Sequence, residues 1–343
     1  MVAGVSVLAA AYQPLWTAGA VYEDRRWLAE AIVRPSVWPR PRSLALWAWW
    51  LAPGARAAHL LSLALHLLVS GLVGVLAWRL GLSRGAAWFA AGLLALHPLT
   101  SEAVGYLSAR TELLAAVGVL GACLLATVAF RPWSWLAIAS CLWLGVMGKE
   151  SASVGFLLVP LVYWATGDRL IAEVTSYVAA LGVAIGVILS GGWQLIADRG
   201  GSAVYADNGT TVLAIMDVSW WPWLLVQATA AMRLLGQAVL PLTLTVDYDY
   251  DVVALWVRYA ALAGLVALAG LAWSQRSRRP LVTFGLAWTL LAILPRFIVQ
   301  TPRGILNEHQ FLTPLIGLVI AGAALWDEWR AYVEALTLRT PHE

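Results

Sequence analysis

Long runs of apolar residues, separated by short polar breaks, recur along almost the whole chain from Val2 to Trp326. A run of about 20 apolar residues is what an α-helix needs to cross the hydrocarbon core of a bilayer. The pattern therefore predicts an all-α polytopic membrane protein of about ten spans, at about 2–20, 57–78, 86–97, 112–130, 133–147, 152–166, 170–192, 253–273, 281–295 and 311–326. Because several runs are shorter than a full span, we expect some helices to extend into their flanks or to be interrupted.

The stretch 213–245 is apolar enough to enter the bilayer but contains Asp217, Gln227, Arg233 and Gln237. Such groups are costly in lipid and tolerable against protein or water. We therefore predict an interfacial or re-entrant segment here, on the side of the outer loops. The chain then divides into one integral membrane domain, 1–326, and a short cytoplasmic C-terminal tail, 327–343.

The composition agrees with a membrane protein. Of the 343 residues, 61% are hydrophobic and 12% are charged, against about 45–50% and 25% in average soluble domains. An ordinary soluble enzyme is excluded. The net charge of +3 comes from arginines scattered among the apolar runs, so no nucleic-acid partner is expected. Cys123 and Cys141 lie in apolar runs, without the spacing of a zinc or haem site, and are expected to pack in the core.

The compact basic loop at 274–279 is the main guide to orientation. The positive-inside tendency places this loop in the cytoplasm, together with both termini, in a bacterial cytoplasmic membrane. The segments 22–56, 97–110, 149–150, 193–212, 247–251 and 296–310 then lie outside. Six arginines on the first outer loop violate the rule, so either the topology is reversed or they face an anionic ligand: Arg25, Arg26, Arg34, Arg40, Arg42 and Arg56.

An acidic pair, Glu23 and Asp24, follows the first predicted span. A carboxylate beside cations at a membrane surface stays ionised at neutral pH, so it could act as a general base or orient an acceptor hydroxyl. The structural alternative is an ordinary solvated loop cluster.

A second polar cluster follows His97, where Pro98 should end or kink a span. We predict a short surface helix beyond it that presents Glu102, Tyr106 and Arg110 on one face, at i, i+4 and i+8. A structural network at a helix break is the alternative.

Three further features have both functional and structural interpretations. Lys149, the single lysine, forms either a local ion pair with Glu150 or a phosphate contact. His59 and His66 share one face of a span at a spacing too wide for a metal site, which favours a buried, hydrogen-bonded pair. The last predicted outer loop adds two cations, an acid and a histidine: Arg296, Arg303, Glu308 and His309.

In order and spacing, these segments resemble bacterial relatives of the transmembrane tetratricopeptide-repeat O-mannosyltransferases. These are membrane glycosyltransferases that use a polyprenyl-phosphate sugar and have a GT-C-like fold. The resemblance is carried by Val21-Tyr22-Glu23-Asp24, Arg42, AAHLLSLALHLL at 57–68, HPLTSEAVGYLSARTELLAA at 97–116, GKES at 148–151, VLPLTLTVDYDYDV at 239–252 and NEHQFLTPLIGL at 307–318.

The resemblance implies transfer of a sugar, with mannose as the candidate, from a polyprenyl-phosphate carrier to an acceptor hydroxyl outside the membrane. Glu23 and Asp24 would be catalytic, and the substrate-binding positions would be Arg42, His97, Glu102, Arg110, Lys149, Arg303 and Glu308; Glu112 also falls on a motif position. Membrane lipid, the lipid-linked sugar and a protein acceptor or partner subunit are the implied partners. No residue pattern supports a divalent metal.

Three departures from these relatives keep a non-catalytic scaffold or accessory subunit open. Glu23 replaces an aspartate, Gln310 stands where arginine is usual, and the tail 327–343 stands where the relatives continue into repeats. In a scaffold, Arg42, Arg110, Lys149 and Arg303 should be satisfied by protein groups or solvent. In a transferase, at least two of these cations should converge on a lipid-facing cavity that reaches the acidic pair.

Overall fold

The computed structural model describes most of the predicted membrane domain: residues 10–16, 18, 43–52, 54–128, 134–167, 171, 174, 178, 203–207, 210–214, 220–245, 253–298 and 305–337. Glu23, Asp24, Arg42 and Arg303 lie outside these residues, as do most of the predicted spans 2–20 and 170–192.

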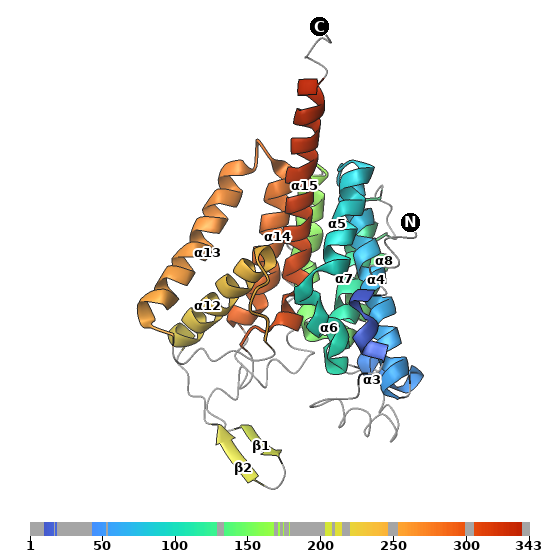
Figure 1. Ribbon diagram of the computed structural model, residues 1–343, viewed down its shortest axis with the longest axis vertical. Helices are drawn as coiled ribbons and strands as arrows, with labels where there is room; N and C mark the ends of the chain where they lie inside the picture. Colours follow the sequence, from blue (N-terminus) through green and yellow to red (C-terminus); the bar gives the residue numbers. More distant parts are fainter. Residues whose placement is uncertain are drawn as a thin grey trace.

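Helices dominate the described residues, as predicted (Figure 1). The α-helices are α3 (Ser43–Leu51), α4 (Ala55–Arg79), α5 (Arg84–Leu96), α6 (Ser101–Gly105), α7 (Arg110–Ala126), α8 (Ser134–Gly148), α9 (Gly155–Ala165), α12 (Trp220–Val239), α13 (Leu255–Gln275), α14 (Pro280–Ile298) and α15 (Leu312–Thr337). Short 3-10 helices are η1 (Gln13–Trp16), η2 (Pro98–Thr100), η3 (Leu107–Ala109), η4 (Glu150–Val154) and η5 (Glu308–Phe311). The one departure from an all-α fold in the described residues is an antiparallel hairpin of β1 (Ala203–Asp207) and β2 (Thr210–Ala214), with Ala203 opposite Ala214.

Five helical segments of the described chain are long and apolar enough to span a membrane: Ala55–Arg79, Leu107–Ala126, Leu255–Gln275, Pro280–Phe297 and Glu308–Thr337. Three further apolar segments are shorter, at Arg84–Leu96, Ser134–Gly148 and Glu150–Ala165. The chain is thus a helical membrane protein by length and composition, and ten spans remain a prediction. The predicted tail begins inside α15, which continues without a break to Thr337.

Close helix packing depends on small residues at two crossings. A Cβ atom on Gly285 would meet the backbone of Gly317, and one on Gly118 would meet the backbone of Gly145. Glycine therefore allows α14 to lie against α15, and α7 against α8, at backbone contact distance. In lipid such close approach supplies the packing that apolar side chains alone do not, because the tails are equally apolar.

The basic turns gather at one end of the helices, where α15 extends beyond its neighbours (Figure 1). The backbone N–H of Ser83, in the α4–α5 turn, donates to Asp327 at 2.9 Å, and Arg279, in the α13–α14 turn, lies 3.1 Å from Glu328. Arg79 and Arg84, which flank the α4–α5 turn, thus lie at the same end of the helices as the 274–279 loop. Which end faces the cytoplasm remains a prediction.

At the opposite end of the helices, which we call the recessed side, α5 stops short of the end of α4. Helix α5 has 13 residues against 25 in α4, which corresponds to about 20 Å against about 38 Å. The Nε2 atom of His66 lies 3.2 Å from the carbonyl oxygen of Ala95, so α5 ends beside a point about 16 Å from the N-terminal end of α4. The polar segment after His97 therefore starts well below that end.

Helix α12 starts and finishes on this recessed side and runs obliquely beside α13 and α14 (Figure 1). The indole of Trp221 donates to the hydroxyl of Tyr259, in the first turns of α13, at 3.3 Å. Near the other end of α12, the carbonyl oxygen of Ala238 lies 3.0 Å from Nε2 of His97. The side-chain amide of Gln237 donates to the carbonyl of Thr243 at 2.7 Å, so the chain after α12 folds back toward the helix. Both ends of α12 thus contact residues on the same side of the helices, and an interfacial or re-entrant segment at 213–245 stays a prediction.

The topology predicted from the sequence implies opposite labelling of two engineered cysteines, of which position 36 lies outside the described residues. Ser277→Cys, in the basic turn, should react with a membrane-impermeant maleimide only after permeabilisation, and Ser36→Cys should react in intact cells. The control is the parent chain, in which Cys123 is buried and Cys141 is half-buried. Reversed labelling of the two positions would overturn the placement of the polar end outside the cytoplasm.

Candidate functional site

Residues 97–110 form a series of short turns instead of the single helix predicted from the sequence. Pro98 ends α5, as expected, and η2 and α6 follow. At Tyr106 the backbone becomes extended, with φ −84° and ψ 109°, before η3 leads into α7. The prediction of one helix face shared by Glu102, Tyr106 and Arg110 is therefore wrong, because this break points Glu102 and Arg110 at different neighbours.

Arg110 joins three helices inside the protein. Its side chain is buried, and it donates from Nε to the hydroxyl of Ser62 at 3.1 Å and to the carbonyl of Ala58 at 2.8 Å, both on α4. A third contact, of 3.3 Å, reaches the carbonyl of Ala48 on α3. A guanidinium presents five N–H donors in a plane, which suits several acceptors at once. Arg110 thus fixes the start of α7 against α3 and α4.

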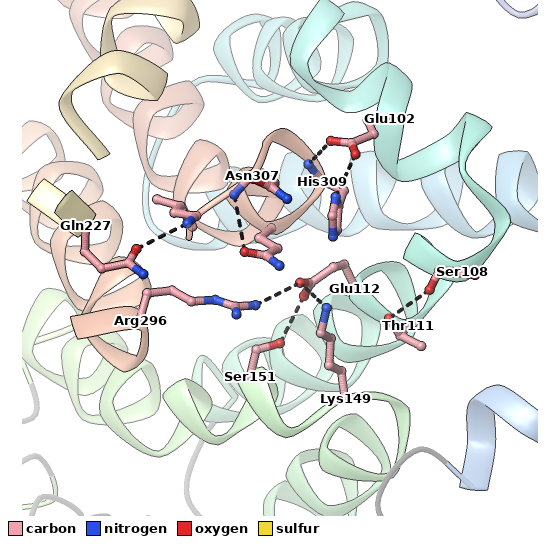
Figure 2. Close-up of polar contacts among 12 residues, drawn as sticks. Glu102, Ser108, Thr111, Glu112, Lys149, Ser151, Gln227, Arg296, Asn307 and His309 are labelled. Atoms are coloured by element: carbon pink, nitrogen blue, oxygen red, sulfur yellow. Dashed lines mark hydrogen bonds and ion pairs between the residues drawn. The ribbon is translucent and has the colours of Figure 1, made fainter. Parts of the chain in front are cut away.

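Glu112 is the centre of a buried ion cluster (Figure 2). Lys149 donates to one of its carboxylate oxygens at 2.7 Å, and the hydroxyl of Ser151 donates to the other at 3.0 Å. Arg296, at the end of α14, approaches the first oxygen at 3.6 Å. The side chain of Glu112 is only 3% exposed, so these partners compensate a charge that has lost its water. Lys149 pairs with Glu112 on α7 and so ties the GKES segment to the 97–116 segment.

Glu102 and His309 form a second pair beside this cluster (Figure 2). One oxygen of Glu102 accepts the backbone N–H of His309 at 2.8 Å, and the other lies 2.9 Å from Nδ1 of the same residue. The ring of Tyr106 meets the imidazole edge-on, with 6.0 Å between centroids. The carboxylate thereby holds the backbone of a residue 207 positions away and lies close to its ring.

Glu308 and Gln227 anchor the α12 region to the last motif. Glu308 is buried and accepts the backbone N–H of Thr245 at 2.8 Å. The amide oxygen of Gln227 accepts the backbone N–H of Leu306 at 3.2 Å. In a region with little water these contacts satisfy backbone groups that would otherwise be costly to bury. The segment 220–245 is therefore held against the η5 region at two points, Gln227 and Thr245.

His97 connects the end of α5 to the end of α12. Its Nδ1 accepts the backbone N–H of Leu99 at 3.2 Å, and its Nε2 lies 3.0 Å from the carbonyl oxygen of Ala238. A ring nitrogen that faces a carbonyl must carry the proton, so the contacts define an Nε2–H imidazole. Burial lowers the pKa of His97, an effect that the hydrogen bond to Ala238 partly opposes. The ring is thus a neutral connector between two helix ends.

The other histidines of the described chain are part of the helix core. His59 and His66 are both buried on α4, as predicted. The carbonyl oxygen of Ala95 contacts the ring of His66 and also accepts a hydrogen bond from the hydroxyl of Tyr12. The ring of Tyr12 packs edge-on against His66. Among the described residues, no group of three histidine, cysteine, aspartate or glutamate side chains is placed to hold a metal ion.

The structure brings together most of the described positions implied by the resemblance. Glu102 contacts His309, and Lys149 contacts Glu112. His97 and Glu308 contact the α12 region, whereas Arg110 contacts α4. The sequence reasoning missed the partners of Ser151 and Tyr12. Ser151 could have been suspected, since it follows Lys149 by two residues within GKES, whereas nothing in the sequence marks Tyr12.

Replacing Lys149 tests whether the Glu112 cluster is a buried charge network. Lys149→Met leaves Glu112 without its closest cation, so we expect a loss of about 3–5 kcal/mol in unfolding free energy, measured by SDS titration in mixed micelles. Glu112→Leu/Lys149→Met should recover much of this loss, because no unpaired charge remains. Arg279→Gln, which breaks a half-exposed pair at the other end, should cost about 0–1 kcal/mol. Equal losses for the single and the double variant would contradict the charge argument.

No family model, curated protein or solved structure matches this chain. A functional interpretation therefore depends on the arrangement of the residues described above and on the resemblance carried by the motifs.

Proposed function

We propose that this chain is a membrane glycosyltransferase that moves a sugar, with mannose as the candidate, from a polyprenyl-phosphate carrier to an acceptor hydroxyl on the extracytoplasmic side. The observation that supports it is the convergence of separate motif segments. Glu102 and Glu112, Lys149 and Ser151, and Glu308 and His309 come from three segments of the chain, and their contacts form one polar region on the recessed side. A lipid-linked substrate keeps its tail in the bilayer while its phosphate and sugar reach this depth.

In the proposed reaction, Asp24 or Glu23 deprotonates or positions the acceptor hydroxyl, which attacks the anomeric carbon with inversion. The bond from that carbon to the phosphate oxygen breaks, and polyprenyl phosphate leaves with the electron pair. Cations stabilise the leaving phosphate. Arg42 and Arg303 are the first candidates, because Arg110 and Lys149 already contact protein groups.

A non-catalytic scaffold on the same fold is the second candidate, and the contacts of Arg110 and Lys149 favour it. Both cations are buried and contact protein oxygens, an arrangement expected where no phosphate is bound. The two functions make opposite predictions for the acidic pair, because a scaffold needs neither carboxylate for chemistry.

The transferase proposal predicts unequal effects of Asp24→Asn and Glu23→Gln. Only one of two neighbouring carboxylates can usually lie within hydrogen-bond reach of the acceptor, so one variant should lose roughly 10²-fold or more in turnover. The assay follows release of polyprenyl phosphate from radiolabelled polyprenyl-phosphate mannose, by protein in nanodiscs supplied with serine- and threonine-containing peptides.

Each variant should keep the wild-type SDS unfolding curve, which separates a catalytic loss from misfolding. Wild-type turnover in both variants would remove the pair from the mechanism. Complete absence of transfer by the wild-type chain, across polyprenyl-phosphate sugars, would favour the scaffold.

A further inference from the structure

Two cations of the Glu112 cluster approach the same carboxylate oxygen. The Nζ atom of Lys149 lies 2.7 Å from it, in a charge-assisted hydrogen bond, whereas the guanidinium of Arg296 lies 3.6 Å from it, beyond hydrogen-bond distance. The other oxygen accepts the hydroxyl of Ser151 at 3.0 Å. Lys149 alone compensates the charge of the carboxylate, so Arg296 adds a second positive charge at this point of the cluster.

Arg296 is also the most accessible of these three charged groups. Its side chain is 20% exposed, against 10% for Lys149 and 3% for Glu112. Figure 2 shows Arg296 extending toward Glu112 from the side of Gln227, whereas Lys149 reaches the carboxylate from a different direction. An anion that enters the polar region can therefore reach the guanidinium of Arg296 more readily than the ammonium of Lys149.

A neighbouring helix fixes the backbone of Arg296. Arg296 lies in the last turn of α14, where the carbonyl groups have no partner further along the helix. The indole of Trp223, a buried side chain on α12, donates to the carbonyl of Arg296 at 3.2 Å. One turn further along α12, Gln227 accepts the backbone N–H of Leu306 at 3.2 Å. Helix α12 therefore positions the arginine as well as the segment that leads to η5.

We propose that Arg296 binds the phosphate of a polyprenyl phosphate, the group that links lipid and sugar in the donor and stays on the lipid after transfer. This inference rests on the transferase proposed above and names a residue that receives its phosphate. A guanidinium has five N–H donors in a plane, so Arg296 can keep its protein contacts and still bind two phosphate oxygens. The phosphate gains negative charge as the sugar leaves, because a diester becomes a monoester, and a fixed cation beside it favours that change.

Two sources could supply a phosphate to this position, a lipid headgroup or inorganic phosphate from water. Glu112 belongs to one segment that is apolar enough to span a membrane, and Arg296 lies near the end of another. A lipid brings its phosphate to this depth because its tail stays in the bilayer. Inorganic phosphate must give up its water without that compensation. The location therefore favours the lipid.

The test is native mass spectrometry of the full chain, titrated with undecaprenyl phosphate, undecaprenol or inorganic phosphate. Arg296→Gln should weaken the binding of undecaprenyl phosphate roughly 10-fold or more, because hydrogen bonds to a charged group are lost, and should leave undecaprenol unaffected. Arg296→Lys keeps the charge without the planar fork, so its affinity should lie between those of the wild type and Arg296→Gln. Arg279→Gln, which loses an arginine at the opposite end, should bind like the wild type.

The double variant Glu112→Leu/Lys149→Met separates the role of Arg296 from that of Lys149. It removes the carboxylate together with its closest cation and leaves Arg296 in place. We expect it to bind undecaprenyl phosphate at least as tightly as the wild type, because the carboxylate no longer competes for the guanidinium. Loss of binding by this variant, with SDS unfolding showing that it is folded, would assign the phosphate to Lys149 and overturn the role of Arg296.

The remaining outcomes distinguish the site, the source of the phosphate and the transferase. No binding of undecaprenyl phosphate by the wild type, or wild-type affinity in Arg296→Gln, would overturn the site while any measured transfer stands. Inorganic phosphate that binds as tightly as the lipid, with the same loss in Arg296→Gln, would overturn the lipid as its source. Binding that depends on Arg296, in a chain that transfers no sugar, would refute the transferase and support the phosphate site.

Discussion

A buried carboxylate on a membrane helix constrains the whole polar side of this protein. Glu112 is almost fully enclosed on α7, and a charge in such a place is tolerated only beside compensating groups. Its partners come from η4 and from α14, so the requirement to pair one charge fixes three parts of the chain relative to one another. Arg110, two residues earlier, does the same for α3 and α4.

Short helices are the structural consequence of this polar region. Helix α5 stops at His97 and α8 ends beside Lys149, because the groups that follow need partners that lipid does not supply. The chain turns there in short 3-10 segments. In this polar region the backbone N–H groups of Leu99, Thr245 and Leu306 donate to side chains, those of His97, Glu308 and Gln227 in turn. Irregular backbone at this depth is stable only because protein surrounds it.

Much of the fold follows from local sequence, whereas the pairings do not. Apolar runs located most of the described helices, and Pro98 located the end of α5. The break at Tyr106 was missed because helical spacing continues through it in the sequence, while the backbone there is extended. The sequence offers Glu150 or a phosphate as the partner of Lys149, since a contact with Glu112, 37 residues away, depends on how α7 and η4 pack.

The stability gained by packing does not explain why this protein has a buried polar cluster. Well-packed apolar residues in place of a buried ion pair are often neutral or stabilising, so a chain selected only for a rigid membrane fold has little use for Glu112 and Lys149. The Glu112 carboxylate has a partner on each oxygen, Lys149 on one and Ser151 on the other. Residues whose own contacts are satisfied in this way are the support that holds the groups of a functional site in place. The internal contacts of Lys149 and Arg110 therefore fit a support layer beneath a reactive site as well as they fit a scaffold.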